Sequence, residues 1–378
     1  MIPRTVFDSE HELLREQVRR FFDREVAPSY ADWEKRGVVP RDFWLTAGEA
    51  GMLCTSVPEE YGGIGADRRY AAILLEEQAR GSYTAPGLSV HSELAAPYLI
   101  NYGSEAQKQR WLPKMIRGEA IAAIALTEPG AGSDLQSMRT SAARDGDHYV
   151  VNGQKTFISN GYSADLVLLA VKTDPTQRAS GISILVVDAA TPGFSRSEPI
   201  HKLGCKGQDT AELFFADMRV PVEDILVGEG QGFGLLMKEL AWERLQIAIS
   251  AVASVEAMLE ETIRYAKERK AFGKSIVDFQ ANRFYLAEMK TAFQVTRAFV
   301  DRCLELVCED SLDGETAAMA KYWATDLACQ VADRCLQIHG GYGYILEYPI
   351  ARFYADSRVT RIYGGTNEIM KEIIGRAL

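Results

Sequence analysis

The sequence lacks the cysteine and histidine patterns of a metal protein. Its 378 residues include six cysteines without a Cys-x-x-Cys pair and five histidines without a His-Glu-x-x-His motif. Thiols scattered in this way match neither a zinc site nor a recognisable disulfide framework. We therefore predict reduced cysteines and no structural metal.

Basic charge and long apolar runs are also scarce. The formal net charge is −10, whereas a nucleic-acid partner requires a basic face that displaces counterions from phosphates. No window approaches the run of about 18 apolar residues that a membrane span needs, and residues 1–12 follow neither a secretory nor a transit pattern. The sequence predicts a cytoplasmic protein that neither binds nucleic acid nor inserts into a membrane.

Two glycine-rich stretches fall short of nucleotide-binding motifs. In residues 228–234, Phe233 stands where a dinucleotide-binding turn needs its third glycine, and a long helical pattern follows instead of a βαβ unit. Residues 273–275 end like a phosphate loop, but Glu268 occupies the position of the first glycine. Both stretches argue against a nicotinamide enzyme and a nucleoside-triphosphate enzyme.

Hydrophobic periodicity predicts a helical domain over residues 1–120. Candidate helices lie near 41–50, 67–80 and 88–102, where apolar residues recur at helical spacing. Two capping boxes are expected, one formed by Ser9 with Glu12 and one by Ser104 with Gln107.

The rest of the chain changes pattern twice. Residues 121–226 hold short apolar runs bounded by glycine, proline and aspartate, with an Asn152-Gly153 turn signal, and they predict a middle antiparallel β-barrel. Residues 227–378 return to the helical period in segments long enough for a C-terminal four-helix bundle. The predicted order is therefore helical domain, β domain, helical bundle.

One carboxylate near the start of the long helical pattern is a candidate base. Glu243 follows Trp242 and precedes Arg244, which could also pair with it as an ordinary surface neighbour. Exposed carboxylates are the rule on helices. A glutamate in a water-poor pocket can instead remove a proton from carbon, and sequence blocks elsewhere favour that interpretation.

Four blocks in a fixed order carry a family resemblance. They are Leu126–Asp134 (LTEPGAGSD), Arg269–Gly273 (RKAFG), Gln337–Gly341 (QIHGG) and Ile362–Glu368 (IYGGTNE). With these blocks the chain resembles the acyl-CoA dehydrogenase family over nearly its whole length, and within it most the long-chain branch. The resemblance implies a helical domain, a β-barrel, a helical bundle and FAD as cofactor.

The resemblance assigns FAD contacts to two groups of residues. Matching positions that face the flavin are Leu126, Thr127, Ser133, Phe157 and Ser159, and positions near the adenosine are Thr366 and Glu368. Matching positions that reach the pyrophosphate and adenine across a subunit interface are Arg269, Phe272, Gln280, Gln337 and Gly341. The resemblance thus implies a homodimer or a dimer of dimers.

Three of these residues have structural alternatives. Large aromatics are mostly core, so Phe157 could pack in the interior. Most arginines are solvated, so Arg269 could be a surface residue. Thr366 stands where a cap of the last helix is expected, a role that is compatible with cofactor binding.

The chain departs from the commonest family pattern at its catalytic position. Gly364 stands where many members carry a glutamate, whereas the long-chain and isovaleryl branches place the carboxylate at the position of Glu243. The resemblance therefore implies that Glu243 is the base. It also implies that the N–H of Gly364, with a ribityl hydroxyl of FAD, binds the thioester oxygen, and that Ser133, Arg244 and Gly365 contact the substrate.

The expected reaction is dehydrogenation of a medium- to long-chain acyl-CoA, straight or branched, to a trans-2-enoyl-CoA, with electrons passed to electron transfer flavoprotein. A short branched-chain, isovaleryl-type dehydrogenase and an acyl-CoA oxidase remain as alternatives. A non-catalytic scaffold would lack the base or the FAD contacts, and the sequence retains both.

Overall fold

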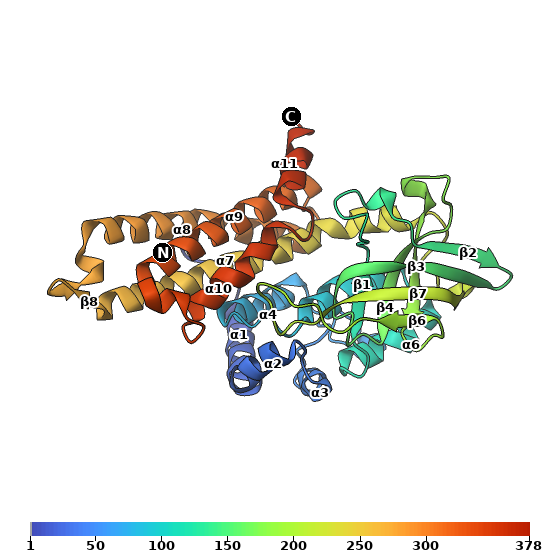
Figure 1. The fold of residues 1–378 in the computed structure, drawn as a ribbon, viewed down its shortest axis with the longest axis horizontal. Helices are drawn as coiled ribbons and strands as arrows, with labels where there is room; N and C mark the ends of the chain where they lie inside the picture. Colours follow the sequence, from blue (N-terminus) through green and yellow to red (C-terminus); the bar gives the residue numbers. More distant parts are fainter. Residues whose placement is uncertain (1) are drawn as a thin grey trace.

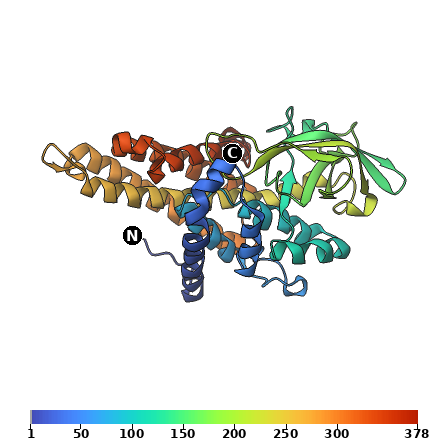
Figure 2. The ribbon, with the colours of Figure 1, turned by 60° about the horizontal axis from the view of Figure 1, so that its bottom comes forward.

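The computed structural model describes residues 2–378 as three consecutive parts (Figure 1). The N-terminal part is helical and packs beneath the long helix of the C-terminal bundle; Figure 2 shows its first helix running across the bundle. Its helices are α1 (Ser9–Phe21), α2 (Tyr30–Arg36), α3 (Arg41–Glu49), α4 (Arg68–Arg80), α5 (Ala96–Tyr102) and α6 (Glu105–Ile116). A π-helical segment, Val90–Ala95, leads into α5.

Helix caps distinguish one correct prediction from one wrong prediction. The capping box of Ser104 with Gln107 is confirmed at the start of α6. The box expected from Ser9 and Glu12 is wrong, because Asp8 is the N-cap of α1. The Asp8 carboxylate accepts from the backbone N–H of His11 at 3.3 Å, and Nδ1 of the His11 ring accepts from the backbone N–H of Asp8. The aspartate one residue upstream satisfies the first N–H groups, so α1 begins at Ser9.

The β domain is a curled seven-stranded sheet. Its strands are β1 (Ala122–Ala125), β2 (Ser141–Asp145), β3 (His148–Ser159), β4 (Leu166–Lys172), β5 (Ile182–Asp188), β6 (Phe194–Arg196) and β7 (Thr210–Pro221). The expected β domain between two helical domains is confirmed, with two differences in pairing. Most neighbouring strands are antiparallel, but β1 and β2 both run parallel to β4, with Ala122 opposite Leu166 and Ser141 opposite Lys172. Strands β1 and β4 are almost wholly buried, as is usual for parallel strands.

The Asn152-Gly153 turn prediction is wrong. The chain continues through both residues in β3 and shifts register against β7 between Val151 and Gly153. Asn152 lies at this register shift and its side chain bonds to Asp217 on β7. The side-chain NH₂ donates to the Asp217 carboxylate, and the side-chain oxygen accepts from the backbone N–H of Asp217. The β2–β3 turn lies at Gly146, which has φ +61°. Asn-Gly suits bulges as well as turns, and only the pairing partner decides between them.

The C-terminal bundle is built on one long helix. Its elements are α7 (Gly232–Glu268), the hairpin β8 (Lys270–Ala271) and β9 (Lys274–Ser275), α8 (Gln280–Cys308), α9 (Gly314–His339), α10 (Pro349–Ser357) and α11 (Asn367–Gly375). The 37 residues of α7 span about 55 Å at 1.5 Å per residue. Figure 1 shows the β domain at one end of α7 and the β8–β9 hairpin at the other. No helix within residues 2–378 is long and apolar enough to cross a membrane.

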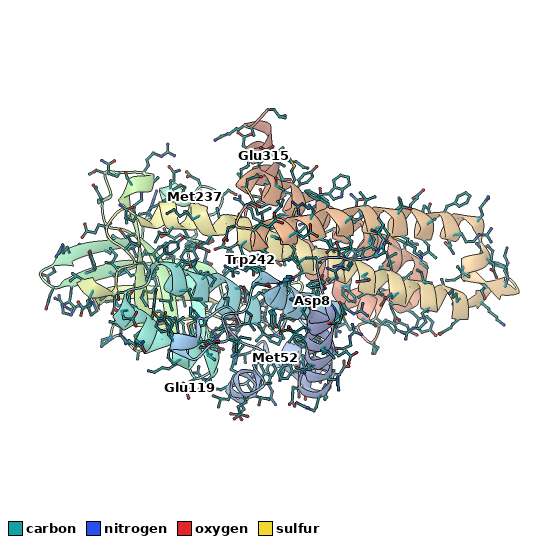
Figure 3. The ribbon with its side chains drawn as sticks, turned by 180° about the vertical axis from the view of Figure 1, so that it is seen from behind. Asp8, Met52, Glu119, Met237, Trp242 and Glu315 are labelled. Atoms are coloured by element: carbon teal, nitrogen blue, oxygen red, sulfur yellow. The ribbon has the colours of Figure 1, made fainter. Side chains whose placement is uncertain are left out.

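Trp242 marks a place where the N-terminal part meets the C-terminal bundle. Its label in Figure 3 lies where the N-terminal helices reach α7. The indole is buried, its N–H donates to Glu93 at 3.3 Å, and the guanidinium of Arg68 lies 4.7 Å from the ring centroid. This contact joins α4, the π-helical segment and α7, and it fixes the stretch of α7 that carries Glu243.

Candidate active site

Glu243 lies on α7 opposite helix α5. The hydroxyl of Tyr98 donates to Oε1 of Glu243 at 3.0 Å. The Glu243 residue as a whole is partly exposed. Burial raises the pKa of Glu243 to about 7, and the charge of Glu239 acts in the same direction, whereas the Tyr98 hydrogen bond opposes the rise. A carboxylate with this pKa is suited to accept a proton near neutral pH.

The loop around Gly364 lies over the same side of α7. A Cβ atom built on Gly364 would lie 2.4 Å from Cδ1 of Ile247, one helical turn after Glu243. Gly364 has φ +66° and Gly365 has φ +87°, conformations that favour glycine. The structure thus brings together Gly364 and the stretch of α7 that carries Glu243, 121 residues apart in the sequence.

Two buried cations lie close to each other near this loop. The ammonium of Lys321 donates to the Gly365 carbonyl and to Oδ1 of Asn367, both at 2.8 Å. Arg244 is buried, and no carboxylate of residues 2–378 forms an ion pair with it. Burial lowers the pKa of Arg244 and, together with the Arg244 charge, lowers the pKa of Lys321 to about 8. These groups make a positive region beside Glu243 that suits the negative charge of a bound ligand.

The turn after β1 is clamped to strand β3. The N–H of Thr156 donates to the carbonyl of Thr127 at 2.9 Å. Lys155 is fully buried and donates to the Leu126 carbonyl at 3.0 Å and to Oε1 of Glu128 at 2.8 Å. Burial lowers the pKa of Lys155 to about 8, and the Glu128 charge opposes that change. The clamp fixes Leu126 and Thr127 next to Phe157.

Phe157 is an exposed aromatic in an unusual conformation. Its side chain is 66% exposed, so the core alternative is excluded. It has φ +59° at a second register shift of β3, between Lys155 and Ile158. A left-handed conformation costs a residue with a side chain about 1–2 kcal/mol, and such strain gathers at functional sites. The ring offers a flat apolar wall, and exposed Ser133 and partly exposed Ser159 add hydroxyls in the same domain.

The second group of predicted residues lies at the far end of the bundle. Arg269 and Gly341 line a cavity of about 520 Å³, and the Arg269 guanidinium lies 5.7 Å from the Tyr342 ring centroid. Phe272 is 95% exposed at the tip of the β8–β9 hairpin. All members of this group are exposed: Arg269, Phe272, Gln280, Gln337 and Gly341.

The structure does not bring this group to Glu243 within one chain. Arg269 follows Glu243 by 26 residues along α7, which places it about 39 Å away along the helix axis. No single extended dinucleotide covers that distance. Arg269 is a surface arginine of the single chain, and it has no ion-pair partner within residues 2–378.

Thr366 and Glu368 lie beside the Gly364 loop. The Thr366 hydroxyl accepts from the N–H of Ile369 at 3.3 Å, so the predicted cap of the last helix is confirmed. Glu368 is exposed in the first turn of α11. Both residues are therefore near the active-site end of the molecule, separated from the group around Arg269.

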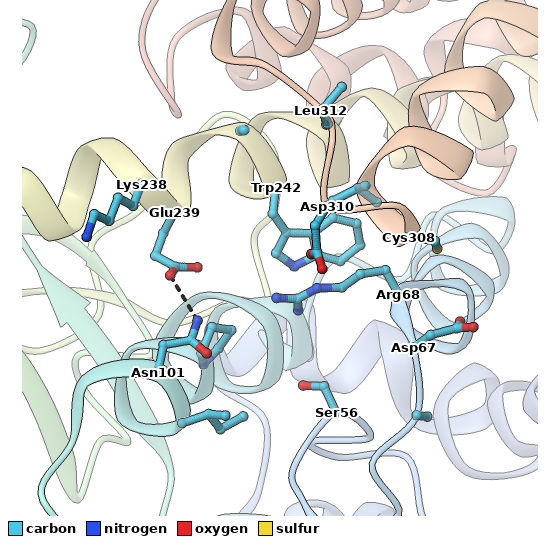
Figure 4. A pocket seen from close by; sticks show the side chains of 15 residues that line it. Ser56, Asp67, Arg68, Asn101, Lys238, Glu239, Trp242, Cys308, Asp310 and Leu312 are labelled. Carbon is cyan, nitrogen blue, oxygen red and sulfur yellow. Dashed lines mark hydrogen bonds between the residues drawn. The ribbon is translucent and has the colours of Figure 1, made fainter.

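A polar cavity of about 440 Å³ lies beside α7 (Figure 4). Arg68, Asn101, Glu239 and Trp242 point into it from α4, α5 and α7. Asn101 donates to Oε1 of Glu239 at 3.0 Å. The cavity gives Glu239 a polar surrounding one helical turn before the candidate base.

Sequence reasoning missed two residues that shape the site. Tyr98 has no motif around it, and its contact with Glu243 joins positions 145 residues apart. Lys155 could have been found, because this lysine lies between Val151 and Ile158, two buried apolar residues of the same strand. A buried lysine needs an anionic or carbonyl partner, and the Leu126–Asp134 block supplies both.

Models of three acyl-CoA dehydrogenase domains match this chain in order. The N-terminal domain matches residues 8–119, the middle domain residues 123–218 and the C-terminal domain residues 230–378. The chain belongs to the acyl-CoA dehydrogenase family. Its predicted family and fold class are confirmed.

Individual relatives agree with this membership. The mitochondrial long-chain specific acyl-CoA dehydrogenase of Sus scrofa is 51% identical over 99% of this chain and 88% of its own length. The mitochondrial isovaleryl-CoA dehydrogenase of Oryza sativa is 37% identical over 99% of this chain and 92% of its own length. A crystal structure of an acyl-CoA dehydrogenase from Geobacillus kaustophilus superposes with a TM-score of 0.97 at 48% identity, covering 99% of each chain.

Family membership settles the reaction class. Acyl-CoA dehydrogenases are FAD-dependent oxidoreductases that act on acyl-CoA and typically work with electron transfer flavoprotein. The predicted enzyme class and the FAD cofactor are therefore confirmed, and the exposed Phe157 wall and the unpaired Arg269 fit a flat ring and a diphosphate. The mammalian relative is named as mitochondrial, so the cytoplasmic location of this acyl-CoA dehydrogenase stays a prediction.

Proposed function

We propose that this acyl-CoA dehydrogenase oxidises long-chain acyl-CoA thioesters with Glu243 as the catalytic base. The observation that carries the proposal is the placement of the Glu243 carboxylate, which is held by Tyr98 beside the Gly364 loop and whose pKa is raised by burial to about 7. A carboxylate of raised basicity next to amide donors is what proton removal from the α-carbon of a thioester needs.

Each residue then has a defined task. Glu243 removes a proton from the α-carbon of the substrate. The N–H of Gly364 donates to the thioester oxygen, where negative charge develops. Bound FAD supplies the acceptor for the hydride that leaves the β-carbon. The product is a trans-2-enoyl-CoA, and the proton remains on Glu243 until it is lost to solvent.

The proposed cofactor contacts come from two chains. Leu126, Thr127, Ser133, Phe157 and Ser159 of one chain hold the flavin, with Thr366 and Glu368 near the adenosine. Arg269, Phe272, Gln280, Gln337 and Gly341 of a second copy hold the pyrophosphate and adenine. The separation of about 39 Å within one chain supports this division, and a homodimer or a dimer of dimers follows from it.

Ser133, Arg244 and Gly365 are the proposed substrate contacts. The buried, unpaired guanidinium of Arg244 supports an anionic partner, and Ser133 is an exposed hydroxyl on the glycine-rich turn. We also propose three folding units with the limits 1–120, 121–226 and 227–378, which is supported by the connections after α6 and before α7.

The decisive variant is Glu243→Gln. It is expected to retain FAD but to abolish flavin bleaching when mixed anaerobically with acyl-CoA, because the amide cannot accept the proton. Glu260→Gln is the matched control, since Glu260 is an exposed carboxylate on the same helix and surface ion pairs contribute little. Bleaching of Glu243→Gln at nearly the wild-type rate would exclude Glu243 as the base.

The preference for long chains is tested separately. The relative of Sus scrofa named for long-chain substrates is 51% identical, whereas the isovaleryl-CoA dehydrogenase of Oryza sativa is 37% identical. A panel of acyl-CoAs of graded length and branching, assayed with an artificial electron acceptor, is expected to give the highest kcat/KM for long straight chains. A maximum at isovaleryl-CoA would support the short branched-chain alternative. Rapid hydrogen peroxide formation in air would support an oxidase.

A further inference from the structure

Helices α5 and α7 face each other through a ladder of hydrogen bonds. On α5, Asn101 and Tyr102 follow Tyr98 by three and four residues, so both lie next to it on the helix surface. On α7, Glu239 and Glu243 are one turn apart and share the facing side. Tyr98 donates to Glu243 at 3.0 Å, while Tyr102 and Asn101 donate to Glu239 at 2.7 and 3.0 Å.

The two carboxylates of the ladder are held differently. Oε1 of Glu239 receives two donors, and the residue is buried at the edge of the polar cavity in Figure 4. Glu243 receives one donor and keeps part of its surface accessible. The better satisfied carboxylate is thereby fixed in place, and the other one remains able to bind a proton.

The rigid part of this arrangement is Tyr98. Its side chain is fully buried in the core of the N-terminal domain, and its ring packs 6.2 Å from that of Tyr102. A buried tyrosine has few alternative rotamers, so its hydroxyl defines one position for the carboxylate it binds. The ionisable groups that face Glu243 are Tyr98 from α5, and Glu239 and Arg244 from α7.

We propose that Tyr98 is a positioning residue for the catalytic base, which aims the Glu243 carboxylate and sets its working pH range against the opposing charge of Glu239. The inference rests on the proposed role of Glu243. The Tyr98 hydroxyl favours the ionised carboxylate by hydrogen bonding, and Glu239 disfavours it by like-charge repulsion. The two neighbours therefore act on the base in opposite directions.

Two variants separate these effects by sign. Tyr98→Phe removes a hydrogen-bond donor to the ionised Glu243 carboxylate. The acid limb of the pH profile of kcat/KM, where Glu243 ionises, is therefore expected to move to higher pH by about one unit. Glu239→Gln removes a negative charge, so the same limb is expected to move to lower pH. Below the limb, Tyr98→Phe is then about tenfold slower than wild type at the same pH, and it approaches the wild-type rate at high pH.

Tyr149→Phe is the matched control. Tyr149 is also a buried tyrosine that donates to a glutamate, Glu229, at 2.7 Å, but it lies in the β domain away from Glu243. The acid limb of the kcat/KM profile of Tyr149→Phe is expected to coincide with that of wild type. Bound FAD and the thermal unfolding midpoint, measured for all variants, show that each one is folded.

The outcomes distinguish this inference from the function on which it rests. Shifts of opposite sign in Tyr98→Phe and Glu239→Gln support the ladder. If Glu243→Gln is inactive but both variants leave the limb unchanged, or move it in the same direction, the ladder is wrong while the base assignment stands. If Glu243→Gln remains active, the base assignment itself fails.

Discussion

The contact between Gly364 and Ile247 allows a quantitative test of the active-site loop. Gly364→Ala adds a Cβ atom 2.4 Å from Cδ1 of Ile247. Ile247→Val removes that atom, and the next atom of Ile247, Cγ1, lies 4.0 Å away in ordinary contact. One substitution therefore creates a steric conflict and the other removes it.

The expected energies follow from the geometry. Gly364 has φ +66°, which costs an alanine about 1–2 kcal/mol, and moving Ile247 off its rotamer costs about 1 kcal/mol. Only the second cost is removed by Ile247→Val, so the pair should show a coupling of about 1 kcal/mol. Because the proposed mechanism requires the Gly364 N–H to face the thioester oxygen, we expect Gly364→Ala to lower the flavin-reduction rate about tenfold or more, and the double variant to recover about fivefold.

The assay is anaerobic stopped-flow flavin reduction by a saturating acyl-CoA for wild type, both single variants and the double variant. Ile247→Val alone should remain close to wild type, since it removes one methyl group at the edge of the site. Strictly additive effects, with no recovery in the double variant, would show that the Gly364 loop does not depend on its contact with α7.

Two other predictions concern stability and assembly. Glu76 is buried among Arg4, Arg15 and Arg297; burial would raise its pKa, but the guanidinium groups outweigh burial and lower the pKa to about 2. Its folded-state pKa is below the unfolded value of about 4.5, so about 3 kcal/mol of stability is present above pH 4.5 and is lost as the pH falls toward 2. Glu76→Gln should lower the unfolding free energy at pH 7 by about 3–5 kcal/mol in denaturant titrations, and an unchanged midpoint would contradict this. Phe272→Ser should reduce both FAD retention and the oligomer mass in light scattering, whereas Phe284→Ser, at an exposed phenylalanine of α8, should leave both unchanged; equal effects of the two variants would contradict a cofactor site completed by the β8–β9 hairpin.

The long elements were predictable because their signals are local. The helical period of α7, α8 and α9 repeats over many turns, and the apolar runs of β4 and β5 stand between clear breakers. Helix α10 has a weaker local signal, because it has only nine residues and begins at Pro349, soon after the glycines at 340, 341 and 343. The misread Asn152-Gly153 signal shows the same limit, because its local chemistry permits either a turn or a bulge.

The candidate site was predictable residue by residue but not as an arrangement. Glu243, Gly364 and the Leu126–Asp134 block were recognisable from sequence. The exposure of Phe157 was not, because its left-handed conformation arises from a register shift of β3 against β7. The same is true of Tyr98, which reaches Glu243 only because α5 packs across α7.

The sequence by itself determined the order of the three domains, the residue types available for proton removal and cofactor binding, and hence the family resemblance. Periodicity and short motifs depend on neighbours along the chain, so these features can be read without coordinates. The tertiary structure decided which partners face Glu243, that Gly364 lies against Ile247, and that Arg269 lies about 39 Å along α7 from Glu243. These features depend on how residues far apart in the chain pack together, and no local pattern encodes that packing.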